Sequence, residues 1–327
     1  MPSATAAVVF AALWGVVAIT WLIVMPANAR AKGWHYAHAV LPFAALGLYA
    51  LAPASLREPL RVFLLAGALV FLIMATTWVV GEAWRNHGII DVVYPLVPAA
   101  VGALALSQTP AKLGAHSVVL AALVAIWAAR LVAHMVFTRG NLVSEPEPYA
   151  TLRRKFGAHW RVWAFFSVYM LQGVLCWIWS AVLVFALIAP DEHFAPLDAV
   201  AVAVWLVGFA FQAGGDHQLA RFMRDPTNKG KLFQGGLWSL TRHPNYFGEA
   251  VMWWAYFLFG LAHPWGLIAI VSPIYATWFM ASGSAAPGNE RHMRKTRPDY
   301  DDYARRVPQF FPWPLSVRAS RTSGASQ

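Results

Sequence analysis

Long apolar runs, separated by short polar segments, are the main pattern of this chain. A helix needs roughly 20 apolar residues to cross a bilayer core about 30 Å thick, and several runs approach that length. We therefore expect an all-α polytopic membrane bundle of about nine transmembrane helices. The expected crossings are residues 5–25, 37–52, 62–81, 89–106, 118–137, 163–188, 197–211, 247–262 and 265–281.

Basic residues indicate how this bundle is oriented. Lys and Arg accumulate in residues 139–161, 221–242 and 291–321. Cytoplasmic loops of membrane proteins carry an excess of Lys and Arg, so these three segments are expected on the cytoplasmic side. Alternation of the crossings then places the N-terminus outside and the C-terminus in the cytoplasm, with Arg57 and Arg61 as the pair that departs from this pattern.

The composition agrees with a membrane protein and excludes other classes. Of 327 residues, 59% are hydrophobic and 12% are charged, which is too apolar for a soluble protein of this length. The net charge of +10 comes from short basic segments between apolar runs. This distribution is typical of the cytoplasmic loops of a membrane protein, so we expect no nucleic-acid partner. Cys176 is the single cysteine, and the His residues are scattered, so neither a disulfide nor a metal site is expected.

The densest group of polar residues lies between two apolar runs, over residues 212–249. A connection between helices commonly needs roughly two to eight residues, and this one is several times longer without becoming a Gly/Ser linker. Its Arg and Lys side chains can bind phosphate, and its carboxylates can accept hydrogen bonds from ribose hydroxyls. A nucleotide is therefore a suitable ligand for this segment. The alternative is a basic cytoplasmic loop that contacts lipid headgroups.

The order of residues in this segment favours a binding site. Residues 241–249 read TRHPNYFGE, and Pro244 favours the start of a helix there. Arg242 and His243 would then lie at the positive end of the helix, where anions bind. Asn245 and Glu249 are four residues apart and share a helical face. Glu249 would lie about one turn inside the bilayer and needs a hydrogen-bond donor, either a ligand or a neighbouring Arg.

Two consecutive motifs in this segment carry a family resemblance. QGGLW at residues 234–238, followed by RHPNYFGE at residues 242–249, resembles the signature of the steroid 5-alpha-reductase superfamily. Asp216-x-x-Leu219 with Arg224 before it, and Y-x-x-Y-x-x-x-V-P-x-F at residues 300–310 after it, resemble the same family in the same order. DVVYP at residues 91–95 and W-x-x-R at residues 127–130 are similar to its bacterial 5-alpha-reductase-like membrane proteins. The resemblance covers roughly residues 89–312 and is strong only after Gln212.

This resemblance implies an NADPH-dependent reductase whose cofactor is held between helices, because no Gly-x-Gly-x-x-Gly follows a strand. The expected substrate is a lipophilic small molecule with a carbon-carbon double bond, of steroid, isoprenoid or fatty-acyl type. We expect no obligate protein partner, and we expect a bacterial inner (plasma) membrane location. The positions that match cofactor-holding residues of the family are Asp216, Arg224, Lys231, Asn245 and Glu249. Further cofactor candidates are Arg130, Asn228, Arg242, His243 and Tyr246.

Reduction of a double bond also needs an acid that supplies a proton or polarises a carbonyl. Asp91 and Tyr94 are candidates, three residues apart at a membrane boundary, and His134 is another, one turn from Arg130. Each has a structural alternative: Asp91 as a helix cap, Tyr94 as an interfacial anchor, and His134 with Arg130 as a contact between helices.

The expected organisation has three parts: apolar helices over residues 1–88, a reductase-like membrane domain with cytoplasmic cofactor-binding loops over residues 89–315, and a disordered tail over residues 316–327. The main functional alternative is an S-adenosylmethionine-dependent methyltransferase of the isoprenylcysteine carboxyl or phospholipid type. Arg242-His243-Pro244 and the late Glu290 fit that pattern. A transporter is a third hypothesis, but the first four runs hold scarcely any ionisable residue that could line a polar pathway.

Overall fold

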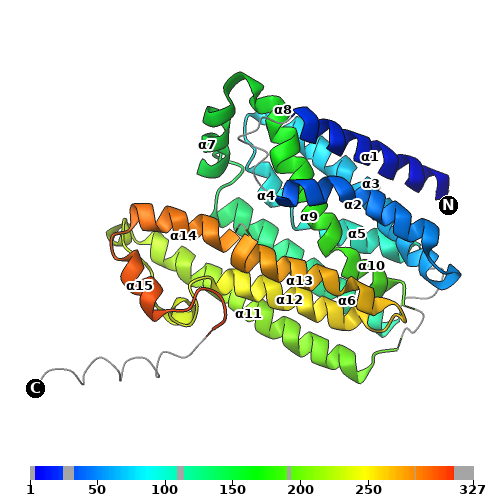
Figure 1. Cartoon of the computed structure of the whole chain (residues 1–327). Helices are drawn as coiled ribbons and strands as arrows, with labels where there is room; N and C mark the ends of the chain where they lie inside the picture. Colours follow the sequence, from blue (N-terminus) through cyan, green and yellow to red (C-terminus); the bar gives the residue numbers. More distant parts are fainter. Residues whose placement is uncertain (1–3, 25–32, 109–113, 190–192, 284, 313–327) are drawn as a thin grey trace, which may run out of the picture. The chain divides into compact units, whose positions relative to one another are not determined.

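The computed structural model describes residues 4–24, 33–108, 114–189, 193–283 and 285–312, and within these ranges every regular element is a helix (Figure 1). The predicted all-α class is therefore confirmed for the described chain. The chain divides into two compact units. Unit 1 comprises residues 1–193 and 260–269, and unit 2 comprises residues 194–259 and 270–327. The predicted tail, residues 316–327, lies outside the described residues, and the predicted three-part organisation stays a prediction.

Unit 1 is built from the first ten α-helices and several short segments. Its π-helices are η1 (His134–Thr138) and η3 (Phe165–Met170), and η2 (Gly157–His159) is a 3-10 turn. Its α-helices are α1 (Ala4–Val24), α2 (Gly33–Leu51), α3 (Ala54–Trp84), α4 (Ile89–Val93), α5 (Leu96–Ser107), α6 (Ala115–Ala133), α7 (Glu147–Phe156), α8 (Trp160–Ala164), α9 (Leu171–Trp179) and α10 (Ala181–Leu187).

Unit 2 contains the remaining α-helices and the polar segment between two of them. The short elements assigned to it are η4 (Pro226–Asn228), η5 (Gly236–Ser239) and η7 (Phe279–Gly283), while η6 (Gly266–Ile270) spans the boundary of the units. The α-helices are α11 (Pro196–Arg224), α12 (Pro244–Gly260), α13 (Val271–Trp278), α14 (Ala285–Thr296) and α15 (Tyr300–Arg306).

Six helical segments in the described chain are long and apolar enough to cross a membrane. They are Ala54–Trp84, Ile89–Ser107, Ala115–Thr138, Glu147–Leu187, Pro196–Arg224 and Gly266–Thr296. These segments support an integral membrane protein. The stretches Ala11–Val24 of α1 and Val40–Leu51 of α2 are apolar as well, and α12 has 17 residues, slightly fewer than the roughly 20 that a crossing needs. The expected nine crossings and the orientation of the termini therefore stay predictions.

The longest helix of unit 1, α3, buries one stripe of its surface. From Gly67 onward its buried positions recur every three or four residues, as expected for one face of a helix. They are Gly67, Val70, Met74, Thr77 and Gly81. The helix ends at Trp84, because the next residue, Arg85, adopts a left-handed conformation with φ of 53°. This turn directs the chain into a polar connection that leads to α4.

In unit 2, α11 and α12 approach closely through a pair of glycines. A Cβ atom added to Gly208 would lie 2.7 Å from the carbonyl oxygen of Gly248, and one added to Gly248 would collide with the Gly208 carbonyl. The absence of side chains at both positions lets the two backbones touch, as small residues do in packed membrane helices. The polar pairs Gln212–Glu249 and Asp216–Asn245 lie beside this contact on the same two helices.

Candidate functional site

The polar segment predicted to bind a ligand begins on α11 and ends on α12. As the sequence predicted, α12 begins at Pro244. Asn245, in its first turn, donates a hydrogen bond from Nδ2 to Oδ1 of Asp216 on α11 at 3.0 Å. Asp216 is buried, and the two residues are 29 positions apart in the chain. Two of the predicted cofactor residues are therefore in direct contact.

One turn along each helix, Glu249 is buried beside Gln212. The Gln212 amide donates from Nε2 to Glu249 Oε2, and the Trp253 indole donates from Nε1 to Glu249 Oε1 at 3.3 Å. The protein itself thus supplies donors to this carboxylate, and they are an amide and an indole where the sequence predicted a ligand or a neighbouring Arg. Within the described chain, Gln212 Oε1 is buried and receives no hydrogen bond. An unsatisfied buried acceptor is costly, so this oxygen is available to a donor group of a ligand.

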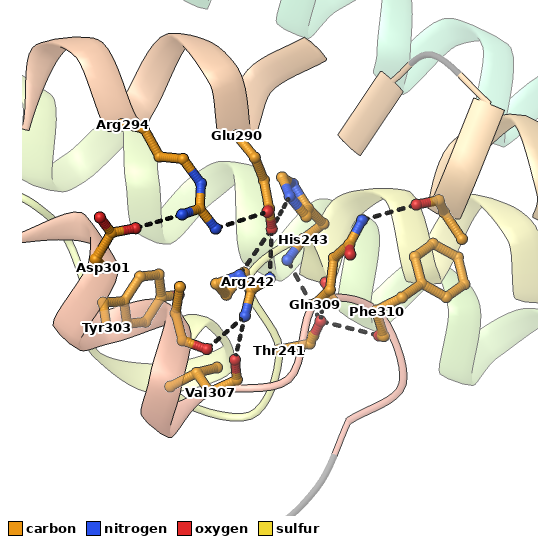
Figure 2. Close-up of polar contacts among 12 residues, drawn as sticks. Thr241, Arg242, His243, Glu290, Arg294, Asp301, Tyr303, Val307, Gln309 and Phe310 are labelled. Atoms are coloured by element: carbon orange, nitrogen blue, oxygen red, sulfur yellow. Dashed lines mark hydrogen bonds and ion pairs between the residues drawn. The ribbon is translucent and has the colours of Figure 1, made fainter. Parts of the chain in front are cut away.

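Arg242, just before α12, is held by the C-terminal part of unit 2 (Figure 2). Its Nε donates to Glu290 Oε1 of α14 at 2.8 Å, and its Nη2 lies 2.6 Å from the same oxygen. Its Nη1 donates to the carbonyl oxygens of Ala304 at 2.9 Å and Val307 at 2.6 Å. Arg242 is 8% exposed. Its guanidinium is therefore largely engaged inside the protein, although the sequence predicted it as a ligand contact.

His243 and Tyr246 lie beside this ion pair. The His243 ring stacks on Tyr246 with centroids 5.4 Å apart, and its Nε2 lies 3.5 Å from Glu290 Oε1. The Tyr246 hydroxyl accepts a hydrogen bond from Asn289 Nδ2 at 2.8 Å. Glu290, which the sequence singled out only for the methyltransferase alternative, thus connects both residues of the Arg-His pair.

The chain after α15 forms a strap, residues 307–310, that fixes the segment before α12. The backbone N–H of Arg242 donates to the Pro308 carbonyl at 2.9 Å, and the Thr241 hydroxyl donates to the Phe310 carbonyl at 2.9 Å. The Tyr303 hydroxyl donates to the Trp238 carbonyl at 2.5 Å. Burial raises the pKa of the Tyr303 phenol, which therefore stays protonated and able to donate. The sequence contained no local signal for these contacts, because the partners are more than 60 positions apart.

Three other predicted cofactor residues lie outside this buried group. Arg224 and Lys231 are exposed near the end of α11. Asn228 donates from Nδ2 to the Phe222 carbonyl at 3.0 Å, so it shapes the turn after the helix. Their roles in binding stay predictions. Exposed cations in this polar segment are compatible with a ligand that carries phosphate.

The candidate catalytic residues belong to unit 1, where Asp91 has two donors. The Tyr149 hydroxyl donates to Asp91 Oδ1 at 2.6 Å, and Asn141 Nδ2 donates to Oδ2 at 2.8 Å. Tyr94 is in a different environment, since its ring packs edge-on against Trp127 and Trp179 with centroids 6.2 and 6.1 Å away. Asp91 is therefore paired with Tyr149, 58 positions away, which spacing along the chain did not reveal.

The remaining unit 1 candidates lie at the end of α6. Arg130 is in its last turn, and His134 begins the π-helix η1. A π-helical segment is uncommon and often lies at a functional site. The assignment of Arg130 to the cofactor and of His134 to catalysis stays a prediction.

The fold and this polar site define an all-helical integral membrane protein with buried carboxylates and amides at the junction of α11 and α12. Residues 77–307 match the model of a family described as protein of unknown function (DUF1295), and the chain belongs to this family. An uncharacterized protein of Schizosaccharomyces pombe is 22% identical over 286 residues, which cover 76% of this chain and 79% of that protein.

Two relatives have named activities. The 3-oxo-5-alpha-steroid 4-dehydrogenase 1 of Mus musculus and that of Rattus norvegicus are each 37% identical over 92 residues, which is 28% of this chain. The match spans only 34% of each of those enzymes. These matches relate the chain to the steroid 5-alpha-reductase family at low coverage, and the predicted bacterial branch stays a prediction.

Proposed function

We propose that this chain is an NADPH-dependent membrane reductase that saturates a carbon-carbon double bond in a lipophilic substrate of steroid, isoprenoid or fatty-acyl type. The observation that carries the proposal is the group formed by Asp216, Asn245 and the open acceptor of Gln212. Similarity to two enzymes named as steroid dehydrogenases supports the reaction class. We also propose a bacterial plasma membrane location and no obligate partner.

The donor and acceptor chemistry of this group suits a nicotinamide dinucleotide. Gln212 Oε1 can accept from an amide or hydroxyl of the ligand, and Asp216 can accept from a ribose hydroxyl. The exposed Arg224 and Lys231 would neutralise phosphates. When bound, the reduced nicotinamide supplies a hydride. Arg242 acts differently, because its bonds to Glu290 and the strap make it a positioning residue for the start of α12.

The proton that accompanies the hydride is assigned to Asp91. Its carboxyl is hydrogen-bonded to the Tyr149 hydroxyl at 2.6 Å, which holds one oxygen in a fixed direction. Tyr94 and His134 remain alternative acids. Because the lipid-soluble substrate is unidentified, the assignment rests on the fixed carboxyl-phenol pair and not on a substrate pose.

A thermal-stability experiment tests the cofactor assignment. A ligand that binds only the folded protein raises its free energy of unfolding, by about 2.7 kcal/mol at a ligand concentration 100 times the dissociation constant. The melting temperature rises as a result. Detergent-purified chain is heated with NADPH, with NADH or with S-adenosylmethionine. Stabilisation by NADPH supports the reductase. Stabilisation by S-adenosylmethionine alone would reject it.

One observation favours the methyltransferase as a second candidate. Arg242, His243 and Glu290 lie together, with Arg242 Nη2 2.6 Å and His243 Nε2 3.5 Å from Glu290 Oε1. These residues are the ones that fit the methyltransferase pattern. The Asp216–Asn245 pair belongs to the reductase pattern instead. Which of the two cofactors stabilises the protein in the experiment above decides between the two functions.

A further inference from the structure

The chain reverses direction directly after η1, in a turn formed by residues 139–144. Gly140 permits the reversal, because its φ of 69° lies in the left-handed region that glycine adopts without strain. The Asn141 backbone N–H donates to the Met135 carbonyl at 3.1 Å, and the Val143 N–H donates to the Gly140 carbonyl at 2.8 Å. These bonds fold the turn back against the end of the helix that precedes it.

Asn141 fixes this turn to the rest of unit 1. It is 4% exposed. Its carbonyl oxygen accepts a hydrogen bond from Asn86 Nδ2 at 2.9 Å, and its own Nδ2 donates to Asp91 Oδ2 at 2.8 Å. Because its backbone N–H is bonded to Met135 as well, the residue is held at three points. The two residues that follow Asn141 are therefore held at the surface of unit 1.

These two residues, Leu142 and Val143, are apolar. Leu142 is 39% exposed and Val143 is 89% exposed. The exposed face of the next helix, α7, has a different character and carries no large aliphatic or aromatic side chain. Its exposed residues are Glu147, Pro148, Thr151, Arg154 and Lys155. In this connection, large apolar exposure is thus confined to the turn, and such a patch is unfavourable in water.

The apolar turn continues an exposed stripe on α6 and η1. Together these helices form the segment Ala115–Thr138, which is long and apolar enough to cross a membrane. Exposed residues recur along it every three or four positions, as on one face of a helix. They include Val118, Ala122, Ile126, Ala129, Ala133 and Phe137. Phe137, the last of them, is 85% exposed and directly precedes the turn region. A surface suited to lipid therefore extends from the helix into the turn.

A basic residue borders the apolar part of the turn. Arg139 is exposed, and it lies between Phe137 and Leu142 in the chain. An Arg at the boundary of a bilayer can keep its aliphatic stem in apolar surroundings and place its guanidinium on lipid phosphate. Residues 139–161 are also expected on the cytoplasmic side, where anionic lipids attract basic residues. The charge of the turn thus complements the membrane surface.

We propose that residues 139–144 bind the bilayer surface. Leu142 and Val143 insert at the boundary between headgroups and acyl chains, and Arg139 contacts a lipid phosphate. The bilayer is favoured over a protein partner because the patch is continuous with the exposed stripe of a crossing segment and is bordered by a cation. Since Asn141 bonds Asp91, insertion also holds that carboxyl close to the membrane surface. The binding depends on the turn and not on the proposed reaction.

Collisions of a spin label with an apolar and a water-soluble reagent measure the insertion. Cys176 is buried and is the single cysteine, so Cys176→Ala gives a background without thiols. A nitroxide is attached to Val143→Cys or, as the matched control, to Thr151→Cys on the exposed face of α7. In lipid nanodiscs, oxygen concentrates among acyl chains, whereas an uncharged nickel chelate stays in water. We expect oxygen collisions to exceed nickel collisions at position 143 and the order to reverse at position 151.

Two results at position 143 would overturn the proposal. An excess of collisions with the nickel chelate would place the turn in water. Low collision rates with both reagents would mean that protein covers the turn, as expected for a second copy or another partner.

Lipid composition tests the contact of Arg139 separately. Adding anionic lipid to the nanodiscs should raise the ratio of oxygen to nickel collisions at position 143, and Arg139→Gln should lose most of that rise. Arg154→Gln is the matched control, because the Arg154 guanidinium on α7 is paired with Glu147, and it should keep the rise. An equal rise with and without Arg139→Gln would reject the phosphate contact.

Discussion

Arg242 and Glu290, 48 positions apart in the chain, form a buried ion pair with Arg242 Nη2 2.6 Å from Glu290 Oε1. The pair joins the segment before α12 to α14, and the same guanidinium bonds the Ala304 carbonyl of α15 and the Val307 carbonyl of the strap. One side chain thus connects three parts of unit 2. We expect the geometry of the cofactor segment to depend on this pair even without direct contact to ligand.

Removing one partner of the pair should destabilise unit 2. Glu290→Gln leaves the Arg242 charge uncompensated, which for a buried pair costs about 3–5 kcal/mol, and partial exposure places the expected loss toward the lower end. The double variant Arg242→Gln/Glu290→Gln should lose less than the sum of the single losses. Chemical unfolding in detergent measures both effects. Additive losses would contradict a direct coupling.

The Asp216–Asn245 contact leads to a prediction about binding. Asn245→Ala removes a hydrogen bond of 3.0 Å to a buried carboxylate and, in our account, a group that orders the ligand site. We expect NADPH affinity to fall by roughly tenfold, the equivalent of about 1.4 kcal/mol, with little change in expression. Glu249→Gln should act in the same direction. Unchanged affinity in both variants would reject their assignment.

Close packing of α11 on α12 can be tested with a single methyl group. Gly208→Ala places a Cβ 2.7 Å from the Gly248 carbonyl oxygen, so the helices must separate. We expect a loss of about 1–3 kcal/mol in the free energy of unfolding, as for other overpacked positions. Gly47→Ala is the matched control, because a Cβ there meets nothing within 4 Å. Equal stability of the two variants would contradict the glycine contact.

Asp91 and Tyr149 should matter for turnover more than for cofactor binding. With a 3-oxo-4-ene steroid, or another unsaturated acceptor found by screening steroids, isoprenoids and acyl lipids, Asp91→Asn should lower kcat by on the order of a hundredfold. Tyr149→Phe removes the hydroxyl that bonds Asp91 at 2.6 Å and should lower kcat by a smaller factor. Stabilisation by NADPH should persist in both. If Asp91→Asn weakens NADPH binding and leaves kcat unchanged, Asp91 takes part in cofactor binding and not in proton transfer.

The connection before α7 should make stability depend on pH. Burial acts to raise the pKa of Glu145, but the hydrogen bonds from Arg153 and from the His87 backbone outweigh it, so the pKa is lowered. A carboxyl whose pKa is lowered in the folded state contributes stability above its ordinary pKa of about 4.3, and loses it as pH falls toward the folded value. Melting temperatures measured between neutral and acid pH should therefore fall less steeply for Glu145→Gln than for wild type. Parallel curves would contradict this contribution.

Local pattern predicted much of the fold but little of the tertiary network. Apolar runs fixed the helical class, and Pro244 marked the start of α12, because both depend on residues close in the chain. The sequence indicated that Glu249 needs a hydrogen-bond donor, but it did not identify the donor. Which residue faces this carboxylate depends on how α11 packs on α12. The partner of Asp91 is 58 positions away, and the carbonyls that hold Arg242 belong to α15 and to the strap after it, which periodicity does not place beside Arg242.

The central claim is that the buried polar group at the junction of α11 and α12 binds a reduced nicotinamide dinucleotide. A direct binding isotherm tests it: NADPH is titrated into the full chain in nanodiscs, beside Asn245→Ala and beside S-adenosylmethionine as the competing cofactor. The account predicts saturable binding of NADPH that Asn245→Ala weakens by roughly tenfold. Saturable binding of S-adenosylmethionine with none of NADPH would contradict it.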